Sequence, residues 1–275
     1  MQVITSKDNN LIKSIKKLKE KKYRDSNNEY VVEGIKMCEE AIKYNAKIKK
    51  IILCEDCEKT SEISKTTMYE IAKFDCVYVT REIFKTLTDV VNPQGIIAII
   101  AKEKNEKEID YAKQSVIVAL DDIQDPGNLG TIIRTIDSCG LNQLIVSSKT
   151  ADCYNPKVVR STMGAIFRVK VIQCDDLGAV IKESKKHKFK AVVSSLDAQK
   201  TIYEIDYKKK FIVIGNEANG VNEKIQELSD EKIKIPMIGK SESLNASVAT
   251  GIILYEYVRQ NIYNSKTLWY NPIIQ

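Results

Sequence analysis

The chain has 275 residues, of which 43% are hydrophobic and 29% are charged, and its formal net charge is +6. This length is sufficient for two globular domains of roughly 100–200 residues each. No apolar run approaches the ~18 residues of a membrane span, and residues 1–10 lack the apolar core of a signal peptide, so we expect a cytoplasmic protein.

Histidine and cysteine content limits the chemistry that is available. His187 is the only histidine and lies in a charged run, which excludes a Ser-His-Asp triad and an HExxH zinc site. Seven scattered cysteines are an odd number, which favours reduced thiols over a disulfide framework. Cys54 and Cys57 form a CxxC pair without the further ligands that zinc requires. We therefore expect no metal site and regard a redox role for this pair as the less favoured alternative.

Positive charge is concentrated near the N-terminus. Residues 7–24 contain eight lysines or arginines and two acidic residues, which accounts for the whole net charge. Leu11, Ile15 and Leu18 recur at helical spacing, so this basic arm predicts one amphipathic helix. Lysine and arginine neutralise phosphates and release counterions, which makes RNA the simplest partner. The alternative is a solvated helix that docks through its apolar side.

The N-terminal part of the chain predicts a small α/β unit. Strands are expected at 29–32, 50–53, 77–79 and 96–101, and helices at 34–44 and 63–73. The charged segment 102–113 predicts a linker, which gives domain boundaries of 1–101 and 114–275.

In the C-terminal part, apolar strands alternate with amphipathic helices. Strands are expected at 115–120, 143–147, 169–172, 191–195, 211–215 and 232–235, with helices that begin near 128, 156, 177, 219 and 244. This alternation predicts an α/β fold with a mainly parallel sheet that is covered on both faces. Ligands of such sheets bind beyond the carboxyl ends of the strands.

The first of three polar junctions follows the strand 115–120. A Pro-Gly turn leads into a helix for which Asn128 is a candidate N-cap. Gly130 and Arg134 are four residues apart and share a helix face, which places Arg134 near the backbone N–H groups of the first turn. The alternative for Arg134 is a structural role on the helix surface.

The second junction follows the strand 211–215. Gly215 and Gly220 bracket Glu217 and permit a close approach of the backbone. The alternative is an ordinary strand-to-helix turn with a solvated glutamate.

The third junction lies within residues 235–254. An apolar segment ends at Pro236, and after a polar loop one helix face carries Leu244, Val248, Ile252 and Tyr255. Ser243 or Asn245 is expected to cap the first helical turn, whose N–H groups suit a polar ligand. The alternative is a well-capped core helix. Because all three junctions close strands at the same sheet edge, they predict one composite pocket.

The motifs at these junctions occur together and in order. They are Asn128-Leu129-Gly130 with Arg134, Gly215-Asn216-Glu217 with Gly220, Ile235-Pro236-Met237, and Ser243-Leu244-Asn245-Ala246-Ser247-Val248-Ala249. Asn155-Pro156-Lys157, Arg160, Met163-Gly164-Ala165 and Phe167 accompany them. This set resembles the SpoU/TrmH family of RNA 2′-O-ribose methyltransferases, which belong to the SPOUT class. Tyr30-Val31-Val32-Glu33-Gly34 and Pro93-Gln94-Gly95-Ile96 resemble the family's substrate-binding domain, an L30e-like fold, so the resemblance spans almost the whole chain.

The resemblance implies a C-terminal SPOUT domain with a deep trefoil knot, which binds S-adenosylmethionine (SAM) in the knot and forms a homodimer. The residues expected to contact SAM are Gly215, Asn216, Ile235, Met237, Ser243, Leu244 and Ser247. The residues expected to hold RNA phosphates are Arg160 and, in the basic arm, Lys16, Lys17, Lys21 and Arg24.

The resemblance assigns catalysis to Arg134, with Asn128, Asn245 and Glu217 around it. An arginine is effectively never deprotonated in proteins, so we expect Arg134 to bind phosphate and hydroxyl together and to stabilise the developing alkoxide. The proton would pass to a phosphate oxygen or to water. Asn128 and Asn245 would align substrate and backbone, and Glu217 would orient Arg134 or a loop.

Nucleotide and magnesium sites are less favoured on spacing. The Gly-Lys-Ser at 239–241 lacks the P-loop glycine that would fall at Lys234, and no GxGxxG opens the second domain. Asp121, Asp122 and Asp125 suggest magnesium, but turn chemistry explains them better.

Two alternatives for function stay open, a transfer RNA 2′-O-methyltransferase and a non-catalytic RNA-binding protein on the same fold. The two-domain chain with its basic arm resembles the ribosomal RNA enzymes, so we expect ribosomal RNA as the substrate.

Overall fold

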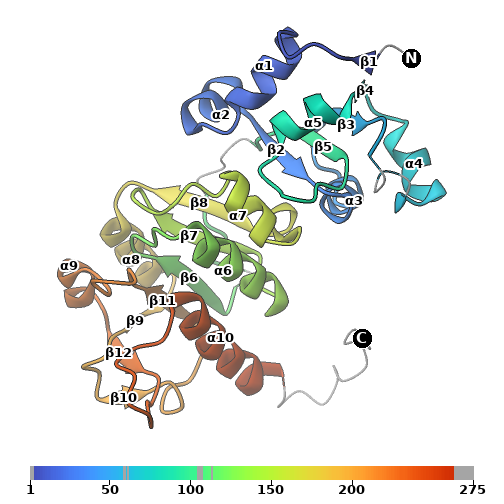
Figure 1. The fold of residues 1–275 in the computed structure, drawn as a ribbon. Helices are drawn as coiled ribbons and strands as arrows, with labels where there is room; N and C mark the ends of the chain where they lie inside the picture. Colours follow the sequence, from blue (N-terminus) through green and yellow to red (C-terminus); the bar gives the residue numbers. More distant parts are fainter. Residues whose placement is uncertain (1–2, 58–59, 61, 104–107, 113, 263–275) are drawn as a thin grey trace. The chain divides into compact units, whose positions relative to one another are not determined.

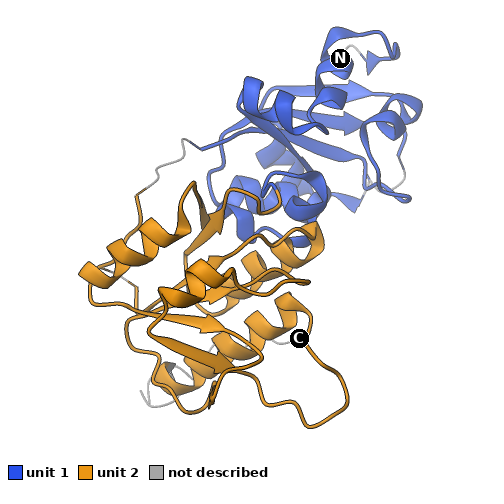
Figure 2. Ribbon diagram, turned by 90° about the vertical axis from the view of Figure 1, so that its left-hand side faces the viewer, with its two compact units in different colours: residues 1–105, 152–168 blue, residues 106–151, 169–275 orange. Residues whose placement is uncertain are grey.

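The computed structural model describes residues 3–57, 60, 62–103, 108–112 and 114–262 (Figure 1). The chain forms two compact units, one of residues 1–105 with 152–168 and one of residues 106–151 with 169–275 (Figure 2). Segment 152–168 thus groups with the N-terminal unit, whereas the predicted boundaries place it in the C-terminal domain. Residues 104–107 and 113 of the predicted linker, and the C-terminal 263–275, lie outside the described residues.

The first unit is built on a five-stranded mixed sheet. Its strands are β1 (Val3–Ile4), β2 (Glu29–Glu33), β3 (Ile48–Cys54), β4 (Cys76–Val79) and β5 (Ile96–Ala101), in the order β1-β4-β3-β5-β2. β3 pairs in parallel with β4, and β5 pairs antiparallel with β3 and with β2. Alternate residues of β5 enter the cores on both faces, which explains its uninterrupted apolar sequence.

Helices cover both faces of this sheet. They are α1 (Asn10–Lys17), α2 (Lys21–Asn27), α3 (Ile35–Lys43), α4 (Lys65–Ile71), α5 (Arg81–Leu87) and α7 (Pro156–Ser161). The core on one face contains residues of α3, α4 and α7, and the core on the other contains residues of α1 and α5. A 3-10 turn, η2 (Ala165–Phe167), follows α7.

The basic arm forms two helices, so the prediction of one helix was wrong. Glu20 has an extended backbone and is the N-cap of α2, which separates it from α1. The buried stripe consists of Ile12, Ile15 and Leu18 and packs into the core that α5 shares, whereas Leu11 is only half-buried. The arm therefore docks through its apolar side, the alternative that the spacing left open.

The second unit is built on seven parallel strands, which agrees with the mainly parallel sheet that was predicted, although the short strand Lys200–Thr201 was not among the six strands expected. They are β6 (Val116–Leu120), β7 (Gln143–Ser147), β8 (Lys170–Cys174), β9 (Lys190–Ser194), β10 (Lys200–Thr201), β11 (Lys210–Ile214) and β12 (Glu231–Lys234). Their order is β10-β12-β9-β11-β6-β7-β8, and each recorded pairing is parallel.

Helices flank this sheet on both faces. α8 (Leu177–Lys186) and α9 (Glu223–Glu227) share one core cluster with β6, β9 and β11. α6 (Pro126–Ser138) packs against α10 (Ala246–Ile262), and both lie on the opposite face (Figure 1). The α/β fold class is confirmed, and the trefoil knot stays a prediction. None of the helices in the described part of the chain has the length and hydropathy of a membrane span.

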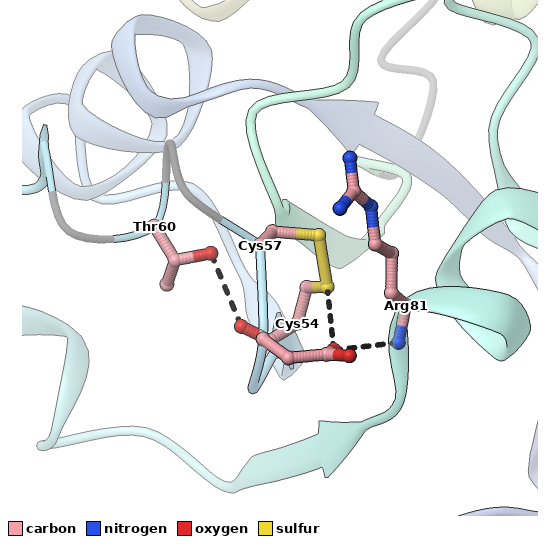
Figure 3. The surroundings of a disulfide bond; sticks show 5 residues. Cys54, Cys57, Thr60 and Arg81 are labelled. Atoms are coloured by element: carbon pink, nitrogen blue, oxygen red, sulfur yellow. Dashed lines mark hydrogen bonds between the residues drawn. A yellow bond between two sulfur atoms is a disulfide. The ribbon is translucent and has the colours of Figure 1, made fainter.

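Cys54 and Cys57 form a disulfide, which differs from the expectation of reduced thiols (Figure 3). β3 ends at Cys54, and the following turn returns Cys57 to within 5.5 Å between Cα atoms. The turn is fixed by Asp56, whose Oδ1 accepts from the backbone N–H of Arg81 at 2.7 Å, and by Thr60, whose hydroxyl donates to the Cys54 carbonyl at 3.1 Å. The other five cysteines are free. A CxxC spacing is compatible with both reduced thiols and a disulfide, so the sequence alone did not decide between the two states.

Candidate active site

The three polar junctions start from strand ends at one edge of the same sheet. β6 and β11 are adjacent, with Leu120 opposite Ile214, and the N–H of Asp121 donates to the carbonyl of Ile214 at 2.9 Å. β12 lies beyond β9 in the same parallel sheet, so its carboxyl end faces the same edge. The predicted convergence of the junctions at one edge therefore has its structural basis in this strand order.

Asp125, rather than Asn128, caps helix α6. Its Oδ1 accepts from the backbone N–H of Asn128 at 2.8 Å, and Pro126 occupies the first helical turn. Proline is favoured there because its missing N–H would have no partner in any case. An aspartate directly before a proline was the signal that could have located this cap. The Asn128 side chain, which is buried, is thereby free for other partners.

Side chains from all three junctions form one hydrogen-bonded chain, which we call the Glu217–Asn128–Asn245 chain. Asn128 Nδ2 donates to Glu217 Oε1 at 2.8 Å, and Asn245 Nδ2 donates to Asn128 Oδ1 at 2.9 Å. Asn245 Oδ1 in turn accepts from the backbone N–H of Ser247 at 3.0 Å and from its hydroxyl at 2.6 Å. Asn245 is thus the cap of α10, one of the two residues expected. The structure brings Asn128, Glu217 and Asn245 together as predicted for a single site.

The loop after β11 is closed too tightly for a side chain at Gly215. A Cβ there would lie 2.1 Å from the carbonyl carbon of Gly220, which itself has φ +68°. Asn216 and Gly220 exchange two backbone hydrogen bonds, at 3.0 and 2.9 Å. Asn216 Nδ2 also donates to the carbonyl of Asp122 at 2.7 Å, which joins the second junction to the first.

The aspartates that suggested magnesium accept hydrogen bonds from other parts of the protein. Asp121 Oδ2 accepts from the backbone N–H of Asn222 at 2.7 Å, and Asp122 Oδ1 accepts from the Ser147 hydroxyl at 2.6 Å. Burial raises the pKa of the Asp121 carboxyl, and the bond from Asn222 partly offsets this. Ser147 and Asn222 were not singled out in the sequence, because neither lies in a motif. The described residues contain no cluster of three or more side chains arranged to hold a metal ion.

Arg134 does not have the partner that was considered for it. Its side chain is exposed, and within the described residues it makes no hydrogen bond or ion pair. Glu217 accordingly orients Asn128 instead of Arg134. The guanidinium is left available for a ligand, which is the condition that its predicted role requires.

The residues expected at the cofactor differ in exposure. Gly215 and Ser247 are buried, Asn216, Ile235, Met237 and Leu244 are half-buried, and Ser243 is exposed. Ser243 does not cap α10, because Asn245 does. Along residues 237–245, no backbone N–H donates to another described residue, so this loop offers free donors.

Among the residues expected to hold RNA phosphates, the prediction for Arg24 was wrong. Lys17, Lys21 and Arg160 are exposed and Lys16 is half-buried, but the Arg24 side chain is only 2% exposed. Its guanidinium donates to Asp152 Oδ2 at 3.1 and 2.5 Å and to two carbonyls of the preceding turn at 2.8 and 2.7 Å. Each nitrogen of the guanidinium donates to a protein acceptor, so Arg24 stabilises the first unit.

Two family models match the two parts of the chain. The model of the SpoU rRNA Methylase family matches residues 115–255, and that of the MRM3-like substrate binding domain matches residues 9–98. The chain belongs to the SpoU rRNA methylase family. The residues of the Glu217–Asn128–Asn245 chain all fall within the methylase match.

Named relatives and a solved structure agree with this membership. The 23S rRNA (guanosine(2553)-2′-O)-methyltransferase RlmP of Bacillus subtilis (strain 168) is 31% identical, over 93% of this chain and 98% of that protein. The 23S rRNA (guanosine-2′-O-)-methyltransferase RlmB of Xanthomonas axonopodis pv. citri (strain 306) is 31% identical, over 62% and 72%. The crystal structure of an AdoMet-bound rRNA methyltransferase from Sinorhizobium meliloti superposes with a TM-score of 0.83 at 29% identity, over 94% and 97%. The predicted family, enzyme class and methyl donor are thereby confirmed.

Proposed function

We propose that this chain transfers the methyl group of SAM to a ribose 2′-hydroxyl of ribosomal RNA. The observation that carries the proposal is the Glu217–Asn128–Asn245 chain, which joins the three family motifs at one sheet edge. The relatives RlmP and RlmB are both named for 23S ribosomal RNA, which supports that substrate over transfer RNA. Ribosomal RNA as substrate also supports the cytoplasmic location expected from the sequence.

The residues at this edge suit SAM. Gly215 allows backbone to approach without a side chain, and the N–H groups of 237–245 are free to donate to polar groups of a ligand. Half-buried Ile235, Met237 and Leu244 supply apolar surface for an adenine ring. When bound, SAM supplies an electrophilic methyl group on a sulfonium. We assign its binding to Gly215, Asn216, Ile235, Met237 and Leu244, with Ser243 and Ser247 beside them.

Glu217 sets the direction of the hydrogen-bonded chain. An ionised carboxylate only accepts, so the Asn128 amide must turn its NH2 group toward Glu217 and its oxygen toward Asn245. Asn245 then presents its NH2 to Asn128 and its oxygen to the start of α10. We therefore assign Glu217, Asn128 and Asn245 to positioning, since each orients the next.

Arg134 is the group we assign to the reacting hydroxyl. Its planar guanidinium can bind a phosphate oxygen and the ribose oxygen together and stabilise negative charge as the alkoxide develops. The hydroxyl proton leaves to a phosphate oxygen or to water, because the guanidinium stays protonated. Its exposure and lack of a partner among the described residues support this role.

Methyl transfer from SAM to ribosomal and transfer RNA transcripts, followed by mapping of ribose methylation, tests the proposal. We expect the protein to methylate a ribosomal RNA in vitro. The same ribose should be unmethylated in cells that lack the protein. Arg134→Lys keeps the charge but loses the planar fork, so we expect turnover to fall while SAM affinity is kept. Near-full turnover of this variant would refute the assignment of Arg134, and failure to bind SAM in calorimetry would favour a non-catalytic RNA-binding protein.

A further inference from the structure

The first unit contains a small pocket that the reaction does not use. It is enclosed by residues of α1, β2, α3, α7 and the end of α5, and its volume is about 30 Å³. Its walls are largely apolar and include Ile15, Val31, Leu87 and Val159. Four charged residues complete the lining, namely Lys19, Glu33, Asp89 and Arg160. An apolar pocket with a few convergent polar groups is the usual form of a ligand site.

Two of the four charged residues neutralise each other. Lys19 Nζ lies 2.6 Å from Asp89 Oδ1. Glu33 and Arg160 have no such partner: within the described residues, neither forms an ion pair. The pocket is therefore left with one carboxylate and one guanidinium that are available to a ligand.

Glu33 is held in place as an acceptor. Its Oε1 accepts from the Thr88 hydroxyl, while its Oε2 accepts no hydrogen bond from a described residue. Burial raises the pKa of this carboxyl, and the Thr88 bond and the charge of Arg160 act against the rise. A half-buried carboxylate that forms no direct ion pair with a described residue is stabilised further when a ligand provides donors.

The size of the pocket limits what can enter. A water molecule needs about 10–15 Å³ of such volume, so about 30 Å³ holds two or three groups of that size. This fits the hydrogen-bonding edge of one nucleobase, with the ring resting at the mouth, and is too small for a whole base.

The geometry of a carboxylate selects among the bases. Its two oxygens accept only, so the best partner presents two neighbouring donors. The Watson–Crick edge of guanine does so through N1–H and the N2 amino group, whereas adenine, cytosine and uracil each place an acceptor beside their donor. Such edges are readable only in unpaired RNA.

Charge around the pocket favours a nucleic acid. α1 and α2 carry Lys16, Lys17 and Lys21, none of which forms an ion pair with a described residue. Lys19, two residues after the end of α1, lines the pocket itself. A polyanion passing along these helices would reach the mouth of the pocket, where Arg160 can bind a phosphate.

We propose that this pocket binds the Watson–Crick edge of one unpaired guanine of the RNA substrate, with Glu33 accepting from N1–H and the N2 amino group and Arg160 binding an adjacent phosphate. The inference rests on the proposed function, because it takes the ligand to be RNA. It adds a base-specific subsite in the unit that does not carry the cofactor residues.

The first test is the binding of mononucleotides to the full chain, followed by NMR of methyl-labelled isoleucine, leucine and valine. Guanosine 5′-monophosphate (GMP) should shift the methyl signals of Ile15, Val31 and Leu87. Inosine 5′-monophosphate (IMP) lacks only the N2 amino group and should bind on the order of ten-fold more weakly. Equal affinities for GMP and IMP, or shifts confined to residues elsewhere, would overturn the proposal.

Variants separate the two contacts. Glu33→Gln should abolish the preference for GMP over IMP, because one of the two acceptors becomes an amide donor, which opposes the N2 amino group that only GMP carries. Arg160→Ala should weaken both nucleotides alike and keep the preference. Glu29→Gln is the matched control on the same strand, where Glu29 pairs with Lys49 at 2.7 Å, and should change neither value. If Glu33→Gln kept the preference for GMP over IMP, the assignment of Glu33 to the guanine edge would be contradicted.

Methyl transfer by the unmodified chain, measured in parallel, keeps the two proposals apart. A chain that methylates RNA but shows no preference for GMP would overturn the pocket assignment and leave the proposed function intact. A chain that shows the preference and its loss in Glu33→Gln, but transfers no methyl group, would support the pocket and overturn the proposed function.

Discussion

The Glu217 carboxylate controls residues that are distant in sequence. It fixes which way the Asn128 amide points, and through it the Asn245 amide at the start of α10. An asparagine amide has no intrinsic direction, because its oxygen and nitrogen ends have nearly the same shape. A single charged acceptor at one end of the chain therefore orders the whole set.

We expect Glu217→Ala to lower kcat on the order of 10–100-fold, because a hydrogen bond to a charged group contributes about 1.5–3 kcal/mol. Glu217→Gln should keep most of the activity, since its amide oxygen can still accept from Asn128. Initial rates of methyl transfer at saturating SAM measure kcat for both variants. Equal loss in the two variants would show that the charge, and not the orientation of Asn128, is what matters.

Burial gives Arg24 a structural role instead of the phosphate-binding role expected from its charge. It lies in the arm that carries the net charge, yet its guanidinium is enclosed by Asp152 and two carbonyl groups. Removing one partner of a buried pair leaves the other charge without compensation.

Arg24→Ala should lower the free energy of unfolding by about 3–5 kcal/mol. Urea denaturation followed by circular dichroism gives this value. Lys21→Ala, at an exposed position in the same helix, should stay within about 0.5 kcal/mol of the unmodified chain. A stable Arg24→Ala chain with weakened RNA affinity would instead restore the role first expected for Arg24.

The loop between β11 and α9 can close only because Gly215 has no side chain. Its two strand-like backbone bonds between Asn216 and Gly220 bring the backbone of Gly220 against Gly215. The closing turn is possible because Gly220 takes a positive φ, which glycine adopts at little cost. This places free backbone at the strand end where we assign SAM.

Gly215→Ala should destabilise the protein by about 1–3 kcal/mol and abolish SAM binding, because a Cβ would lie 2.1 Å from backbone that cannot yield. Calorimetry with SAM and urea denaturation measure the two effects. Gly239→Ala is the control for stability, since no atom lies within 4 Å of the added Cβ and its φ is not positive. Unimpaired SAM binding by Gly215→Ala would contradict the assignment of this loop to the cofactor.

The molecule divides its tasks between two units with separate sheets. The first unit carries the basic helices, the guanine pocket that we propose and the match to a substrate-binding domain. The second carries the three junctions and the match to the methylase family. The α10 helix of the second unit exposes apolar surface, with Val248 50% and Tyr255 56% exposed. Exposed apolar side chains on this helix support the homodimer that the family resemblance implies.

We expect the chain to have the mass of two copies in analytical ultracentrifugation, and Tyr255→Glu to shift it toward one copy. A charge placed in an apolar interface is desolvated without a partner, whereas at the free surface it costs little. Leu196→Glu, at another exposed apolar position of the same unit, should leave the mass unchanged. A single-copy mass for the unmodified chain would contradict the dimer.

Periodicity and turn residues were enough to locate most strands and helices and to place the three junctions at one sheet edge. The apolar runs at 116–120 and 211–214 and the Asp-Pro-Gly and Gly-Asn-Glu turns are local signals, because backbone period and turn geometry depend on neighbours in sequence. The order of the motifs was enough to identify the family and its methyl donor.

The partners of individual side chains depended on the folded chain. Arg24 and Asp152 are 128 residues apart, and Asn128 and Asn245 are 117 apart, so no local pattern joins them. The grouping of 152–168 with the first unit depends on such distant contacts as well. The break at Glu20 and the Cys54–Cys57 disulfide are local features, but the sequence pattern was compatible with more than one state at each. Charge, amide and thiol groups have many possible partners along a sequence, and only packing in three dimensions selects one.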